Sequence, residues 1–216
     1  MENLAKNFLT KAEQERVNAA VREVELTTSG EIVPMIVSRS HEYPMAAMLG
    51  SLFLSIPASL LLAGLIGPWL WLGRDSMWLF LAICLVSFTA CHLLIKRSGC
   101  LTRFFLDRRE ADREIQEGAI AAFYAEKLHK TAGENGILLY ISVLEQKVWI
   151  LADAGINQKI DPSQWHGIVE GLTAGIRDGR RCQALCDAIR LTGQILATHF
   201  PRQQGDRDEL HNLIIR

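Results

Sequence analysis

The sequence lacks the features that define several common classes of protein. It has five cysteines, an odd number without paired spacing, which excludes a small disulfide-stapled scaffold and fits reduced thiols. Its 23 basic and 24 acidic residues nearly cancel, so the net charge gives no reason to expect a nucleic-acid partner. No phosphate-binding loop, dinucleotide-binding glycine fingerprint or nucleophile elbow is present, which disfavours nucleotide-dependent catalysis.

Charge is also missing from two long apolar segments. No Asp, Glu, Lys or Arg occurs between Glu42 and Arg74, and none occurs from Ser76 to Ile95. About 20 apolar residues are enough for a helix to cross the hydrocarbon layer of a membrane. We therefore predict a transmembrane hairpin with helices over residues 46–66 and 77–95, in preference to two buried helices of a soluble protein.

Charged residues around the two apolar segments predict their orientation. The N-terminal segment carries charges throughout and lacks the apolar core of a secretory signal. The connection, residues 67–76, holds one basic residue, whereas five basic residues lie between residues 96 and 109. Because basic flanks stay on the cytoplasmic side of a membrane, we expect both termini in the cytosol and the lipid bilayer as a first partner.

Small residues recur at every fourth position of the first apolar segment. This spacing places them in one ridge along a helix face, where a second helix can approach closely. The second segment offers small partners, so the two helices can pack against each other within one chain, although the ridge also leaves dimerisation open. The ridge consists of Ala47, Ser51, Ser55, Ser59, Ala63 and Gly67.

Periodic apolar positions predict a soluble domain built on both sides of the hairpin. A capping box formed by Thr10 and Glu13 starts the first helix, and Asp161 followed by Pro162 starts a later one. Pro34 cannot donate a ladder hydrogen bond, so its strand should be an edge or a bulged one. The expected elements are a helix over 11–27, a strand over 31–38, a helix within 107–131, strands over 137–144 and 147–153, and helices over 162–179 and 181–199.

These elements imply a layered α/β sandwich with a small mixed sheet, interrupted by a transmembrane helical hairpin. The first part of the domain covers residues 1–43, the hairpin covers 44–97, and the second part covers 98–200. Residues 201–216 form a polar tail, for which we expect no fixed structure.

The same topology predicts a candidate metal site. If the first two strands are joined by a right-handed parallel crossover, Glu31, Gly136 and Asp153 share one edge of the sheet. With Asp161 at the start of the next helix, Glu31 and Asp153 could supply hard oxygen ligands to Ca²⁺ or Mg²⁺. The alternative gives each a local role: Asp161 caps its helix, Asp153 accepts a turn hydrogen bond, and Glu31 sits at an exposed strand start.

Cysteine and histidine offer a second, weaker site. Cys182 and Cys186 lie one helical turn apart and could bind zinc together with His166 or His199. No second cysteine pair or CxxC spacing supports this, so we interpret both cysteines as thiols of the core.

Three segments of the chain form a recognisable set: TTSGEIVPMIV at 27–37, the run from AAFYAEKLHKT to GILLYISVLEQKVWILADAGI at 121–156, and the closing LATHFP. Taken together, in this order and spacing, they resemble the TPM-domain family. The resemblance implies an α/β sandwich and, for some relatives, phosphatase activity or calcium binding. Relatives commonly carry a signal peptide, whereas this chain is similar to a bacterial membrane branch in which two spans follow the first strand. It carries Asp153-Ala154-Gly155-Ile156 in place of the aromatic-glycine turn of the family.

Two functions follow as expectations. The first is a multi-pass protein of the bacterial inner membrane whose cytosolic domain is a non-enzymatic interaction or assembly-support module, with another membrane or cytosolic protein as its partner. The second, implied by the resemblance alone, is a metal-dependent phosphatase of low specificity. The sequence assigns no catalytic residue and no organic cofactor to either function.

Overall fold

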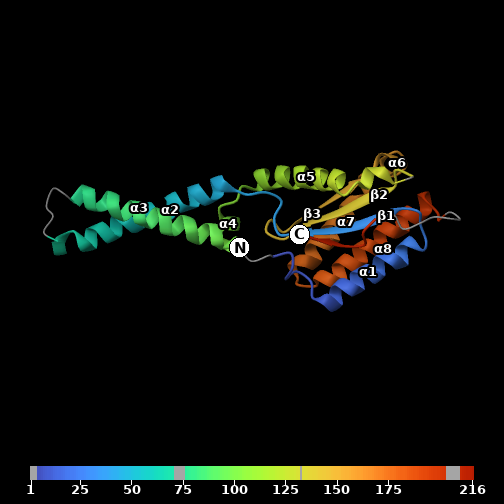
Figure 1. The fold of residues 1–216 in the computed structure, drawn as a ribbon, viewed down its shortest axis with the longest axis horizontal. Helices are drawn as coiled ribbons and strands as arrows, with labels where there is room; N and C mark the ends of the chain where they lie inside the picture. The colour runs from blue at the N-terminus through green and yellow to red at the C-terminus, as the bar shows by residue number, and fades with distance from the viewer. Residues whose placement is uncertain (1–3, 71–75, 132, 203–209) are drawn as a thin grey trace. The chain divides into compact units, whose positions relative to one another are not determined.

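The computed structural model describes residues 4–70, 76–131, 133–202 and 210–216 (Figure 1). It divides the chain into two compact units. Residues 42–111 form one unit, and the segments before and after them together form the other.

The second unit contains a mixed four-stranded sheet with the order β3-β2-β1-β4. Strand β1 pairs with β2 and with β4 in parallel, and β2 pairs with β3 in the antiparallel sense. The α/β architecture with a small mixed sheet therefore confirms the predicted fold class. The strands are β1 (Glu31–Val37), β2 (Gly136–Ser142), β3 (Lys147–Ala152) and β4 (Ile214–Ile215).

Helices cover both faces of this sheet (Figure 1). On one face lies α5, whose buried residues pack with Val33 and Met35 of β1. On the other face α1, α7 and α8 pack with Ile32 and Ile36 of the same strand. The helices are α1 (Lys11–Glu25), α5 (Arg108–Ala125), α6 (Ala154–Asn157), α7 (Gln164–Arg177) and α8 (Arg181–His199), with a 3-10 turn η3 (Leu128–Lys130).

Burial on both faces explains the composition of the two central strands. Every residue of β1 and of β2 is buried. A strand covered on both sides needs apolar residues at successive positions rather than alternate ones, which is typical of parallel pairing. Successive residues then contribute to the two separate halves of the core.

The position of Pro34 matches the prediction for its strand. The backbone groups of Ile36 and Ser38 bond to Arg216, on the β4 side of β1. Since successive backbone groups point to opposite sides of a strand, the nitrogen of Pro34 also faces that side. Strand β4 pairs only with Met35 and Ile36, so Pro34 lies where β1 is an edge and needs no donor.

The last residues of the chain differ from expectation. We predicted no fixed structure for residues 201–216, but Ile214 and Ile215 form β4, and Arg216 donates to Ile36 and accepts from Ser38 at 2.9 and 2.8 Å. The two isoleucines are partly buried beside β1, and a two-residue strand gives no periodic pattern in the sequence, which explains the difference. Residues 203–209 lie outside the described part.

The first unit contains two helices that are long and apolar enough to cross a membrane. Only 22% of the most apolar stretch of α2 and 6% of that of α3 is buried within the structure, whereas the core helix of a soluble protein would be mostly buried. Residues 71–75 of the predicted outward connection lie outside the described residues. The elements are α2 (Pro44–Ile66), a 3-10 turn η1 (Pro68–Leu70), α3 (Ser76–Arg97) and α4 (Gly99–Phe104).

The buried face of α2 includes residues of the small-residue ridge. Ser51, Ser55 and Ser59 have no exposed surface, while Leu61 on another face is 70% exposed. The hydroxyl of Ser59 donates to the Ser55 carbonyl at 2.6 Å, and Ser51 Oγ lies 3.3 Å from His92 Nδ1 of α3. Satisfying these hydroxyls allows polar residues at a contact between two apolar helices.

A bulky residue in the ridge should separate α2 from α3. We expect Ser59→Leu to destabilise the helix pair by about 1–3 kcal/mol, because the buried position has no room for three more carbon atoms. The measurement is thermal unfolding of the full chain in lipid nanodiscs. Gly64→Leu is the matched control, since a side chain there meets open space. Equal midpoints for the two variants would contradict the packing role of the ridge.

Candidate functional site

The strand pairing brings three chain segments to one edge of the sheet. Glu31 at the start of β1 lies opposite Gly136 at the start of β2. The amide of Asp153, which follows β3, donates to the carbonyl of Gly136 at 2.9 Å. The predicted shared edge of Glu31, Gly136 and Asp153 is therefore present, and we call these residues the acidic edge.

A polar loop before β2 connects the parts of the acidic edge. Asn135 is 7% exposed, and its side-chain amide donates to the carbonyl of Ser29. The backbone amide of Glu31 donates to the backbone carbonyl of Asn135 at 3.1 Å. The backbone amide of Asn135 donates to the hydroxyl of Thr131, also at 3.1 Å. These bonds satisfy backbone groups that would otherwise be buried without partners.

Gly155 permits the close approach of this loop to the segment after β3. A Cβ atom at position 155 would lie 2.7 Å from the carbonyl oxygen of Glu134, too close for any real side chain. A glycine is therefore needed at position 155 for this close contact between the two backbone segments.

The two carboxylate oxygens of Asp153 differ in their hydrogen bonding. It is 8% exposed and is the N-cap of α6, where its Oδ1 accepts from the Ala154 amide at 2.8 Å. The predicted turn hydrogen bond is therefore present. Its Oδ2 is buried, and no donor reaches it among the described residues.

Glu31 differs from the expected exposed strand start. It is only 6% exposed, because the loop through Asn135 lies against the start of β1. The expectation of an exposed carboxylate was wrong, since the pattern of a strand does not show which loop will cover its end.

Asp161 is exposed and serves the start of the next helix. Its Oδ1 accepts from the Ser163 amide at 2.8 Å, and this bond lowers the pKa of the Asp161 carboxyl. Among the described residues, no group of three or more histidine, cysteine or acidic side chains is placed to hold a metal ion. Asp161 was expected to cap this helix, but α7 begins at Gln164 with Ser163 as its N-cap, so the bond of Asp161 lies in the turn before the helix. The structure thus brings Glu31 and Asp153 to one edge and leaves Asp161 in a separate turn.

The cysteine pair lies in the core, as we interpreted it. Cys186 is buried among apolar residues, and Cys182 packs against the same cluster. Burial raises the pKa of the Cys186 thiol to about 11, so this sulfur stays protonated near neutral pH. His166 is exposed and its Nδ1 lies 3.2 Å from the Ser163 carbonyl, within its own helix start.

Sequence reasoning missed a buried acid at the other end of the sheet. Glu145 accepts from the Ser40 amide at 3.0 Å and from the Ser142 hydroxyl. It joins the segment that leaves β1 to the hairpin of β2 and β3. Glu145 lies between the two predicted strands, where no motif in the sequence indicated this role.

Comparison with known proteins assigns the domain. The sequence model of the TPM domain matches residues 96–195, which hold α5, β2, β3, α6, α7 and nearly all of α8. The part of the chain from residue 96 to residue 195 is therefore similar to the TPM domain. The matched part of the TPM domain excludes α1 and β1, which the structure supplies from before the hairpin.

A solved structure shares the fold of this chain. The NMR structure of BA42 from the psychrophilic bacterium Bizionia argentinensis is 22% identical, with a TM-score of 0.57 over 96% of this chain and 94% of BA42. At this identity the likeness shows the fold alone. No curated protein matches the sequence at a significant level.

Proposed function

We propose that the chain is a multi-pass protein of the bacterial inner membrane whose cytosolic TPM domain is a non-enzymatic module that binds another protein or supports its assembly. The observation that carries this proposal is the exposed apolar surface of α2 and α3. Leu61 and Leu85 are 70% and 69% exposed, and burying such side chains in lipid stabilises each by about 1.5–3 kcal/mol.

The distribution of basic residues supports the orientation. Lys96 and Arg97 end α3, and Arg103, Arg108 and Arg109 follow within the next turns. Each cation near an anionic cytoplasmic leaflet contributes about 1 kcal/mol. We infer that α3 ends on the cytosolic side, where α5 and the rest of the TPM domain follow.

The roles of the edge residues favour a module over an enzyme. Asp153 and Asp161 both accept hydrogen bonds from the amides of their own turns, and the side chain of Asn135, in the loop before β2, donates to the carbonyl of Ser29 before β1. These contacts stabilise the fold locally. A hydrolase would need acids and bases that converge on a substrate.

One observation favours the second candidate, a metal-dependent phosphatase. The buried Oδ2 of Asp153 accepts no hydrogen bond within the described residues, and Glu31 lies on the same edge. A divalent cation such as Ca²⁺ or Mg²⁺ would supply the missing positive charge, with Asp161 a further candidate ligand only if its turn moves.

Orientation is tested by labelling with a membrane-impermeant maleimide in intact cells. Lys11 is exposed at the start of α1. Trp69, 88% exposed, lies within the predicted outward connection, whereas Met77 begins the second span. We expect Trp69→Cys to be labelled above the level of the parent chain and Lys11→Cys to be labelled only after the cells are permeabilised. The reverse pattern would show that the termini lie outside the cytosol.

Function is tested on the full chain in nanodiscs with p-nitrophenyl phosphate, with and without calcium or magnesium. We expect wild type to hydrolyse no more than Asp153→Asn, because the edge carboxylates act within the fold. Asp187→Asn, an exposed change on α8, is the matched control. The proposal of a non-enzymatic module would be wrong if the wild type shows metal-dependent turnover that is lost in Asp153→Asn and kept in Asp187→Asn. That result would support the phosphatase instead.

The same samples separate a structural cation from a catalytic one. A cation bound only to the folded protein raises its unfolding midpoint. The result to look for is that millimolar calcium raises the unfolding midpoint of the wild type but not that of the combined Glu31→Gln and Asp153→Asn variant. If no phosphate ester is hydrolysed in the same samples, this result would assign a structural metal site to the acidic edge.

A further inference from the structure

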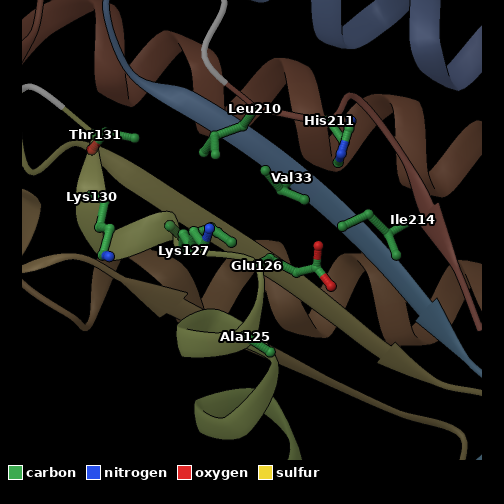
Figure 2. Close-up of a pocket in the computed structure, with 10 residues that line it drawn as sticks. Val33, Ala125, Glu126, Lys127, Lys130, Thr131, Leu210, His211 and Ile214 are labelled. Atoms are coloured by element: carbon green, nitrogen blue, oxygen red, sulfur yellow. The ribbon is translucent and has the colours of Figure 1, made fainter.

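An open pocket with a volume of about 400 Å³ lies where α5 ends (Figure 2). Its walls come from the turn after α5, from β1 and from the segment that leads into β4. A pocket of this size is large enough for a small organic molecule. All of these elements belong to the same compact unit.

The pocket is apolar at its base and polar at its rim. Val33 and Leu128 are buried, and Ile214 is partly buried. The side chains of Lys127 and His211 are exposed and approach the same space from opposite walls (Figure 2). A ligand would therefore meet apolar surface with one part and polar groups with another.

The charges of the pocket do not cancel. Glu126 forms an ion pair with Arg216 of the C-terminal segment, which neutralises the carboxylate. Lys127 and Lys130 line the pocket and form no ion pair among the described residues. The excess of positive charge favours an anion.

Lys127 occupies a backbone conformation that suits glycine better. Its φ is 61° and its ψ is 28°, in the left-handed region, two residues after the last residue of α5. Helices commonly end with glycine in this conformation, since a side chain there is strained. A lysine that costs stability in this position, with its ammonium beside the cavity, indicates a role in binding.

We propose that this pocket binds a small organic anion, with a phosphate or carboxylate group at Lys127 and a short apolar body over Val33 and Leu128. Lys130 adds to the positive field at the rim, and His211 closes the pocket from the side of the C-terminal segment. The proposal does not depend on whether the domain is a module or a phosphatase.

Titration calorimetry on the full chain in phosphatidylcholine nanodiscs tests the pocket. The probes are phenyl phosphate, phenylacetate and the neutral benzyl alcohol, so the first two distinguish a phosphate from a carboxylate. We expect at least one anion to bind, benzyl alcohol to bind at least tenfold more weakly, and the affinity for the anion to fall with added salt.

Two substitutions separate binding from stability. Lys127→Gln keeps the strained side chain and removes the charge, so affinity should fall about tenfold with little change in unfolding midpoint. Lys127→Gly should lose the same affinity while the midpoint rises, because the strain is relieved. Gln146→Gly is the matched control: with φ of 52° it relieves the same strain in the β2–β3 turn and should leave binding unchanged.

Several results would overturn the proposal. They are an absence of binding by both anions at millimolar concentration, benzyl alcohol binding as tightly as the anions, and unchanged affinity in both Lys127 variants.

Discussion

The structure depends on the parallel pairing of β1 with β2. The two strands come from opposite sides of the apolar helices in the sequence, yet all seven residues of β1 have partners in β2, from Glu31 opposite Gly136 to Val37 opposite Ser142. Neither strand could be buried on both faces without the other, because unpaired backbone groups in a core are costly. The acidic edge, the two halves of the core and the site for β4 all follow from this register.

The two units differ in which side chains they bury and which they expose. In the TPM domain the apolar residues face inward, and the polar groups at the strand ends bond to one another through Asn135 and Glu145. In α2 the small polar residues Ser51, Ser55 and Ser59 are buried, whereas many large apolar residues of α2 and α3 are exposed. The second arrangement is stable only where the surroundings are apolar, which is the physical basis of the proposed membrane anchor.

Elements with long periodic patterns could be predicted from the sequence, and those fixed by tertiary contact could not. The capping box of Thr10 and Glu13 marked the start of α1, and the lack of charge marked α2 and α3. Strand β4 was missed because two isoleucines carry no period, and α4 was missed because six residues give too short a pattern. For the candidate site, topology predicted the edge shared by Glu31 and Asp153. The burial of Glu31 and the left-handed backbone of Lys127 depend on loops whose paths the sequence does not show.

Hydrogen exchange of the full chain in nanodiscs tests the split domain most directly. Amides of a shared cooperative unit open together and exchange at similar rates. The account predicts that the ladder amides of β1, residues 31–37, are protected to the same degree as those of β2, residues 136–142. Rapid exchange throughout β1 beside slow exchange in β2 would show that the segment before the apolar helices is not part of the TPM domain.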